Sequence, residues 1–322
     1  MSPYVPAGCQ RAWPYPGTRC SLRLDKLATP MIQVAPRDLA LLLLITVVWG
    51  FNVIVSKVGL AEIPPVLFTF LRFALVAVLL VPTLRVHRGQ MSALTVAALL
   101  SGALNFALSF VGVKLAPNVS SVAIAGQLSV PFTTLLSVAL LGEIVRWRRL
   151  LGIILAFGGV LVIGFDPQML ARWESLAFVV GSALAASLGV IAVKKLYGFK
   201  PLELQAWLAW ISLPPLLLIS LQIEQPDLEA LAQVSWMAWG AVFFTAVVSS
   251  ICAHTGYFYL IQRYPLTSVA PLTTLSPIFT ILFGIVLLGD DLSGRTALGA
   301  ALTLAGVFII TLRERRIVDT GT

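Results

Sequence analysis

The chain has 322 residues, of which 58% are hydrophobic and only 11% are charged, and its formal net charge is +8. A soluble domain needs about 25% charged residues to cover its surface, so this composition excludes an ordinary soluble protein and indicates a surface that faces lipid. The basic residues form short clusters between apolar runs, which argues against nucleic acid as a partner. Cys9, Cys20 and Cys252 lack the spacing of a metal site or a disulfide framework.

Residues 1–36 differ from the rest of the chain because they are rich in proline and arginine and hold no long apolar run. They cannot supply the apolar core of a signal peptide. We interpret this segment as a disordered basic extension. Met31, just before the first apolar run, is an alternative start of the protein, and an organelle transit peptide is a weaker alternative.

Ten apolar runs follow, each about as long as the 17–25 residues that a helix needs to cross a bilayer. They do not alternate in polarity as the strands of a membrane barrel would. Breaks that contain proline separate many of them, as expected where helices end. We therefore predict an all-α membrane protein with ten transmembrane helices, at residues 39–60, 64–84, 92–114, 119–141, 149–165, 175–195, 202–221, 235–262, 267–288 and 296–312.

The charges of the loops indicate an orientation. If both termini are cytoplasmic, most basic loop residues fall on the cytoplasmic side, as the positive-inside rule requires, and few fall on the other side. These residues are Arg37, Arg85, Arg88, Arg146, Arg148, Arg149, Lys194, Lys195, Lys200, Arg263, Arg313, Arg315 and Arg316. The opposite side receives mainly acidic residues, namely Glu62, Asp166, Glu174, Glu224, Asp227, Glu229, Asp290 and Asp291.

An internal duplication is visible without any alignment gap. Residues 119–163 are repeated as residues 266–310, with roughly 18 of 45 positions identical. LLGE in the first copy corresponds to LLGD in the second. Five helices per copy is an odd number, so the copies must cross the membrane in opposite directions. We expect two inverted repeats, 37–166 and 167–313, with a cytoplasmic tail at 314–322. Such proteins usually bind substrate near the midplane between the repeats.

Several short motifs carry a resemblance to a known family. Trp49-Gly50-Phe51-Asn52, Lys57, Pro64-Pro65 and Leu71-Arg72-Phe73 follow one another ahead of LLGE and LLGD. With them, the chain from about residue 37 to about residue 312 resembles the EamA family of the drug/metabolite transporter superfamily, and within it the bacterial O-acetylserine/cysteine exporters. The resemblance implies an inner-membrane exporter of amino acids or other metabolites, with ten helices in two EamA repeats. The N-terminal extension departs from the usual pattern of the family.

Arg72 and Lys57 lie within the predicted spans and not at their last residues, and a charge at the centre of a span costs roughly 2.5–3.5 kcal/mol on insertion scales. Arg72, about two turns into the second span, either faces a central cavity and binds a substrate carboxylate, or is paired structurally or snorkels. Lys57 lies near the outer end of the first span, close to Glu62. It either binds substrate or reaches the outer interface.

Three amides have two interpretations each. Asn52, Asn105 and Gln127 lie within the first, third and fourth spans. Each could bind substrate by hydrogen bonds, or could hold neighbouring helices together. Asn52 and Arg72 are our first choices for substrate contact.

His254 is the one group deep in a span that titrates near neutral pH. It either couples transport to a proton or is packed by hydrogen bonds. Tyr257, Thr273 and Thr274 are further candidates for the same cavity. No Asp or Glu lies in the middle of a span, so a coupling proton would need His254 or a carboxylate at a span end such as Glu62.

Other patterns point away from catalysis. The sequence has no phosphate-binding GxxxxGK[ST] motif, no metal-ligand spacing and no protease constellation in the spans. We therefore expect no enzyme activity, no metal and no cofactor.

Small residues and prolines recur in both copies. Gly152 and Gly159 of the first copy correspond to Gly299 and Gly306 of the second. These glycines predict close packing of the fifth and tenth helices, within one chain or between subunits. Pro131 and Pro277 predict kinks in the fourth and ninth helices beside the cavity.

Together these patterns predict a secondary transporter of a small polar metabolite, such as an amino acid or its derivative, that works by alternating access. The family resemblance implies that it lies in the bacterial inner membrane and exports its substrate. A sugar-phosphate, nucleotide-sugar or drug carrier is the rival within transport, and a receptor or assembly factor on the same scaffold is the rival outside it. The expected partners are the substrate, the bilayer, a coupling proton and a second copy in a homodimer.

Overall fold

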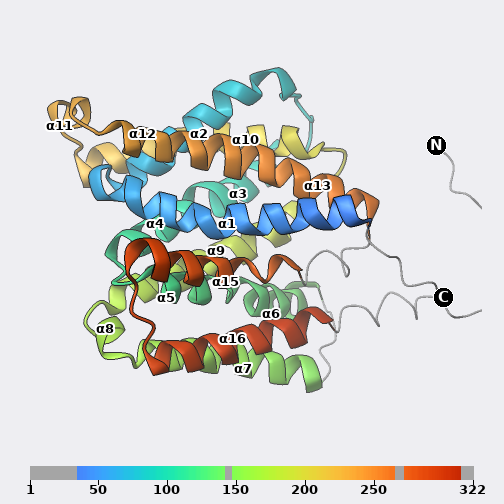
Figure 1. The fold of residues 1–322 in the computed structure, drawn as a ribbon. Coiled ribbons are helices and arrows are strands. Elements are labelled where there is room, and N and C mark those ends of the chain that lie inside the picture. The colour runs from blue at the N-terminus through green and yellow to red at the C-terminus, as the bar shows by residue number, and fades with distance from the viewer. Residues whose placement is uncertain (1–34, 142–146, 265–271, 313–322) are drawn as a thin grey trace, which may run out of the picture. The chain divides into compact units, whose positions relative to one another are not determined.

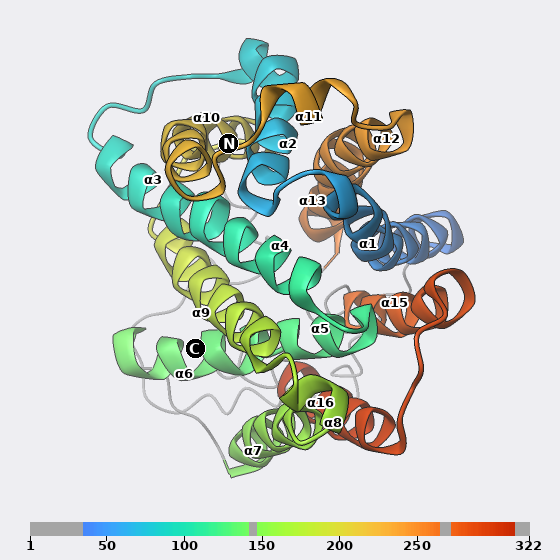
Figure 2. The ribbon, with the colours of Figure 1, turned by 90° about the vertical axis from the view of Figure 1, so that its left-hand side faces the viewer.

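The computed structural model describes residues 35–141, 147–264 and 272–312, which are helical with short connections and contain no strand. Glu143, Arg146, the start of the ninth predicted span and the predicted N- and C-terminal extensions lie outside the described residues. Figure 1 shows the helices of this part of the chain running across the view, and Figure 2 looks onto the ends that lie at the left of Figure 1.

The helices come in the following order, with η marking short 3-10 or π-helical segments. They are α1 (Pro36–Glu62), α2 (Pro65–Leu80), η2 (Val81–Thr83), α3 (Met91–Ala98), η3 (Leu99–Leu104), α4 (Asn105–Leu115), α5 (Val119–Gly126), α6 (Ser129–Leu141), α7 (Trp147–Gly164), α8 (Pro167–Leu170), α9 (Trp173–Lys194), α10 (Pro201–Ile219), η4 (Ser220–Glu224), α11 (Leu228–Ala232), α12 (Trp236–Phe243), η5 (Phe244–Ala253), α13 (His254–Arg263), α15 (Ser276–Phe283), η6 (Gly284–Leu288) and α16 (Gly294–Leu312). Proline opens α1, α2, α8 and α10, where its missing N–H needs no partner.

The prediction of an all-helical membrane protein is confirmed. Within the described residues, nine helices are long and apolar enough to cross a membrane, and the shorter apolar helix Ser276–Leu288 stands at the remaining predicted span. Large apolar side chains such as Leu44, Leu161 and Phe165 are more than half exposed, at 59%, 63% and 65%. Because water would penalise such exposure, these side chains face lipid. The chain is a multi-pass membrane protein.

The fourth and ninth spans are broken at equivalent positions. The turn Gln127–Leu128 separates α5 from α6, and the turn Thr274–Leu275 precedes α15. Pro131 has no N–H for the carbonyl of Gln127, which accepts the N–H of Val130 instead at 3.1 Å. The structure therefore interrupts the fourth and ninth spans just before Pro131 and Pro277, which stand in the first turns of α6 and α15.

The predicted glycine contacts join α7 directly to α16 (Figure 1). A Cβ atom on Gly152 would lie 2.8 Å from the carbonyl oxygen of Gly306, and one on Gly299 would lie 2.5 Å from that of Gly159. Only glycine permits such close backbones. The contact lies within one chain and joins a helix of each repeat.

The two ends of the bundle differ in charge. We call the end that holds Glu62, Asp166, Glu224 and Asp290 the acidic end, and the end that holds Arg85, Arg149, Lys194, Lys200 and Arg263 the basic end. The acidic end carries α8 and α11, at the left of Figure 1. The fourth span runs from the acidic to the basic end and the ninth runs the other way, as expected for inverted repeats.

At the acidic end, Asp290 ties the two repeats together. Its Oδ2 atom accepts the N–H groups of Val119 and Ser120 at 2.9 and 3.2 Å, and the Ser120 hydroxyl at 3.1 Å. Gly289 has φ +69°, a left-handed conformation that turns the chain after η6 and brings Asp290 to the start of α5. A carboxylate is well suited to the unpaired N–H groups at a helix N-terminus.

Candidate functional site

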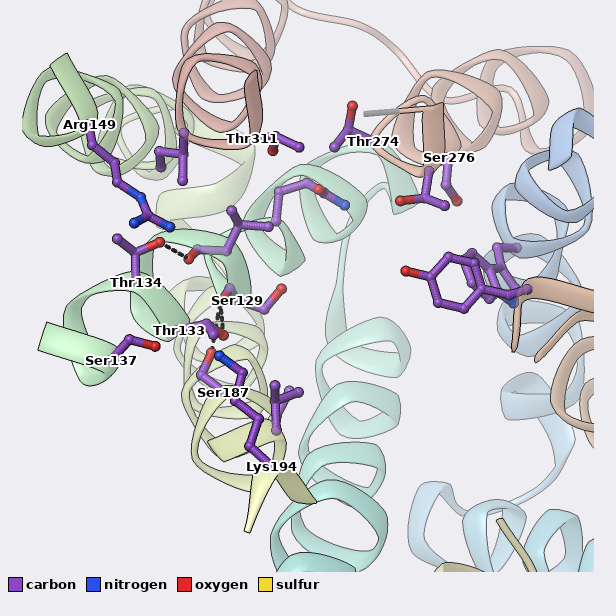
Figure 3. Close-up of a pocket in the computed structure, with 18 residues that line it drawn as sticks. Ser129, Thr133, Thr134, Ser137, Arg149, Ser187, Lys194, Thr274, Ser276 and Thr311 are labelled. Atoms are coloured by element: carbon purple, nitrogen blue, oxygen red, sulfur yellow. Dashed lines mark hydrogen bonds between the residues drawn. The ribbon is translucent and has the colours of Figure 1, made fainter. Parts of the chain in front are cut away.

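A cavity of about 530 Å³ opens beside the broken helices and extends toward the basic end. Its lining comes from both repeats, since Gln127 and Ser129 belong to the first break and Thr274 and Ser276 to the second. The volume suits a small metabolite. Figure 3 shows these side chains around the cavity.

Hydroxyl side chains dominate the polar lining. Ser129, Thr133 and Ser137 recur every four residues and so share one face of α6. Thr133 Oγ1 donates to the Ser129 carbonyl at 2.7 Å, and Thr134 Oγ1 donates to Val130 at 3.0 Å. Ser187 Oγ, from α9, also bonds to the Ser129 carbonyl at 2.8 Å. These hydroxyl hydrogens are already engaged, so the oxygens present mainly acceptor lone pairs to the cavity.

Two cations line the same cavity, Arg149 from α7 and Lys194 from α9 (Figure 3). Among the described residues that line it, none is an Asp or Glu. The Arg149 Nε atom is buried and has no hydrogen-bond partner. The described lining of the cavity therefore carries a net positive charge.

A second cavity, of about 240 Å³, lies on the acidic side of the first. The two share Gln127 and Ser276, so they meet at the breaks of the fourth and ninth spans. Asn52 lines the second cavity, and its Oδ1 atom is buried without a partner. The side chains beyond it toward the acidic end include Ser56 and Val113, near the Lys57 contacts described below.

Five of the nine predicted site residues lie at these cavities. Gln127, Tyr257, Thr273 and Thr274 line the larger cavity, whereas Asn52 and, again, Gln127 line the smaller one. They come from four separate stretches of the chain, which the fold brings together around the breaks.

Arg72 has other surroundings. Its side chain is 1% exposed, and Nε and Nη2 both donate to the Ser250 hydroxyl, at 3.0 and 2.7 Å, whereas Nη1 is buried without a partner. The guanidinium carbon lies 4.5 Å from the ring centre of Phe106 and 5.6 Å from that of Phe110. Arg72 is not among the described residues that line either cavity. These contacts match the paired alternative, in which Arg72 holds α2, α4 and η5 together.

Lys57 caps a helix. Its Nζ atom donates to the carbonyl oxygens of Val113, Lys114 and Ala116, at 2.8, 3.1 and 2.6 Å. These carbonyls end α4, where a cation complements the helix dipole. Lys57 therefore lies at the acidic end of the bundle. This position agrees with the alternative in which Lys57 reaches the outer interface and does not bind substrate.

The last two predicted residues also bond to backbone. Asn105 Nδ2 donates to the Ser101 carbonyl at 3.2 Å, within its own helix. His254 Nδ1 lies 2.8 Å from the Ser249 carbonyl, and its ring centre lies 5.1 Å from that of Trp49. Neither is among the described cavity-lining residues, although Trp49 is.

The sequence prediction did not select the hydroxyls of α6 and α9 or the two cations. Arg149 and Lys194 were assigned to the loops as orientation signals, because each lies at a helix end beside other basic residues. The four-residue spacing of Ser129, Thr133 and Ser137 was a usable signal for a polar helix face.

A polar cavity between two broken helices of opposite direction, inside a bundle of membrane-spanning helices, is the arrangement of a membrane transporter. The model of the EamA-like transporter family matches residues 38–165 and 173–312 of this chain. The chain therefore belongs to the EamA-like transporter family, with one match for each repeat.

Two relatives bear the same name. The "Probable amino-acid metabolite efflux pump" of Salmonella typhimurium is 31% identical over 282 residues, covering 85% of this chain and 94% of that protein. The protein of the same name from Escherichia coli is 30% identical over 296 residues, covering 89% of this chain and 99% of its own. A solved crystal structure of a protein with 18% identity covers 87% of this chain and 98% of its own with a TM-score of 0.58, which shows a shared fold.

Proposed function

We propose that this protein exports a small polar metabolite of the amino-acid type by alternating access. The observation that carries the proposal is the cavity at the two helix breaks, with its hydroxyl and amide lining from both repeats. The names of the two relatives support the amino-acid class and the outward direction.

The orientation is part of this proposal. With the basic end in the cytoplasm, the positive-inside rule is obeyed. The larger cavity then extends toward the cytoplasm, and the Asp290 contacts hold the opposite end together. Such a conformation would load substrate from the cytoplasm of a bacterial inner membrane. Coupling to a proton and assembly as a homodimer stay predictions.

Counterflow into proteoliposomes tests the proposal. The purified full chain is reconstituted, loaded with a panel of unlabelled amino acids and amino-acid derivatives, and supplied with the labelled compounds outside. We expect labelled uptake for at least one of them. Gln127→Ala should reduce that uptake several-fold because Gln127 lines both cavities, whereas Gln168→Ala, an exposed glutamine on α8, should not.

Absence of counterflow for every member of the panel would overturn the amino-acid class. Equal uptake by the Gln127→Ala and Gln168→Ala proteins would instead show that the substrate path avoids the cavities.

A further inference from the structure

We propose that the larger cavity selects a net-negative substrate, an amino-acid derivative with a free carboxylate and with its amine masked or absent. Arg149 and Lys194 are the residues that bind the carboxylate. This inference deepens the proposed function and rests on it, since it names the chemical class of substrate for the same cavity.

The charge balance of the cavity is the first argument. Its described lining holds two cations and no carboxylate. A zwitterionic amino acid would bring its ammonium group near Arg149 and Lys194 without a counter-charge. At a separation of about 8 Å from Arg149 and an effective dielectric constant of about 20, this repulsion weakens binding roughly thirtyfold, whereas water screens the exposed Lys194 more strongly. A carboxylate without an ammonium group avoids this cost.

Arg149 has a buried hydrogen-bond donor that an anionic ligand would satisfy. Its Nε atom is buried without a hydrogen-bond partner, which is costly for a charged group unless a ligand supplies the acceptor. A guanidinium binds a carboxylate with two parallel hydrogen bonds. Arg148, the preceding residue, is exposed, and its guanidinium carbon lies 5.2 Å from the ring centre of Trp147. Two adjacent arginines thus have different surroundings, and only Arg149 lines the cavity.

The hydroxyl face of the cavity is the third argument. Thr133, Thr134 and Ser187 already donate their hydrogens to backbone carbonyls. Their oxygens can accept a hydrogen bond from a neutral N–H group, such as the amide of an acylated amine. In Figure 3 the labelled hydroxyls of α6 and α9 lie in the same region of the cavity as Arg149 and Lys194. One part of the cavity therefore suits a carboxylate, and the neighbouring part suits a masked amine.

The test compares matched compounds in proteoliposomes of the full chain. A panel of labelled N-acetyl amino acids is run beside the parent amino acids, which regain the ammonium group, and beside N-acetyl amino acid amides, which lose the carboxylate. Glycerol 3-phosphate tests whether a phosphate ester uses the same cations. We expect the best N-acetyl amino acid to have at least a tenfold lower half-saturating concentration than its parent, its amide or the phosphate ester.

Variants tie the preference to the two cations. Arg149→Gln and Lys194→Gln should each raise the half-saturating concentration of the N-acetyl amino acid about tenfold, as expected for loss of a charge-assisted contact. Arg148→Gln and Lys195→Gln remove the neighbouring charges, which are exposed and do not line the cavity, and should leave it unchanged. Arg149→Lys should recover part of the affinity.

The outcomes separate this inference from the proposed function. Counterflow of zwitterionic amino acids that Arg149→Gln leaves intact would overturn the inference while keeping the exporter. Equal effects of the cavity variants and the neighbour variants, or transport of the phosphate ester alone, would also overturn it. Failure of every amino-acid-type compound would defeat the proposed function itself.

Discussion

The charged side chains at the two ends of the molecule have different surroundings. At the acidic end, Asp290, Glu224 and Lys57 direct their charges at backbone groups of neighbouring helices. At the basic end, Arg149 and Lys194 line the cavity, where the Arg149 Nε atom is buried without a partner and Lys194 is exposed. A charge at the end of a membrane helix can therefore serve packing or binding, depending on what the neighbouring helix presents.

The physical reason lies in what each helix end offers. Glu224 accepts the N–H groups of Val66 and Leu67 at 2.7 and 2.9 Å, at the N-terminus of α2, where backbone donors are otherwise unpaired. The basic end has polar ties as well. Tyr264 donates to Asp38 at 2.6 Å, and His87 contacts Glu203 at 2.7 Å. None of these four residues lines the larger cavity. The two carboxylates among them therefore do not neutralise Arg149 and Lys194 within its described lining.

The largest stability effect should come from Asp290. Asp290→Ala removes the acceptor of three hydrogen bonds at the start of α5. We expect a loss of about 2 kcal/mol in the free energy of unfolding, since hydrogen bonds to charged groups contribute about 1.5–3 kcal/mol. The measurement is the apparent Tm of the purified protein in detergent. Asp291→Ala, an exposed neighbour, is the control and should not change the Tm.

The Asp290 substitution also tests whether these contacts close the acidic end. Ser56 is buried and lines the smaller cavity. A Ser56→Cys protein that also carries Asp290→Ala should react faster with a membrane-impermeant thiol reagent added at the acidic side than one with Asp290 intact. Unchanged labelling would mean that other contacts keep this end closed.

The next largest effect should come from Lys57. Lys57→Met keeps the apolar length of the side chain but leaves three carbonyl oxygens at the end of α4 without their donor. We expect a loss of about 1–2 kcal/mol, seen as a lower apparent Tm. Lys114→Met, at the exposed end of the same helix, is the matched control. A Tm change of equal size in the control would indicate a general effect of charge rather than the cap.

The cavity cations should affect stability much less than they affect transport. The Arg149 Nε atom has no hydrogen-bond partner and Lys194 is exposed, so we expect Arg149→Gln and Lys194→Gln each to change the free energy of unfolding by no more than about 0.5 kcal/mol. Thermal unfolding of both variants checks this. A clear drop in Tm would show that the basic end, like the acidic end, uses its charges for packing.

The smallest effect should come from Glu62. Its carboxylate accepts the N–H and hydroxyl of Ser235 at 2.7 and 2.6 Å, but the side chain is exposed. Exposed polar contacts contribute little to stability because water replaces them. Glu62→Ala should therefore leave the apparent Tm unchanged, and a drop comparable to that of Asp290→Ala would contradict the distinction between partly buried and exposed contacts.

Much of the fold could be predicted from the sequence. The apolar runs give the helices, because a segment that spans lipid must satisfy its backbone internally. The duplication of residues 119–163 as 266–310 gives the two repeats. The equivalent prolines and glycines give the helix breaks and the α7–α16 contact, because both residue types act through the local backbone.

The partners of the charged residues required the tertiary structure. Arg72 and Lys57 drew attention because they lie inside spans, yet their contacts, to Ser250 and to the end of α4, come from distant parts of the chain. Arg149 and Lys194 resemble ordinary loop charges in the sequence, yet they line the cavity. Local hydrophobicity predicted the apolar helices, and the prolines and glycines predicted the interruptions of the fourth and ninth spans and the α7–α16 contact. Which charged side chains bond to backbone at the acidic end and which line the cavity depends on contacts between helices that are distant in the chain, so local sequence patterns could not predict it.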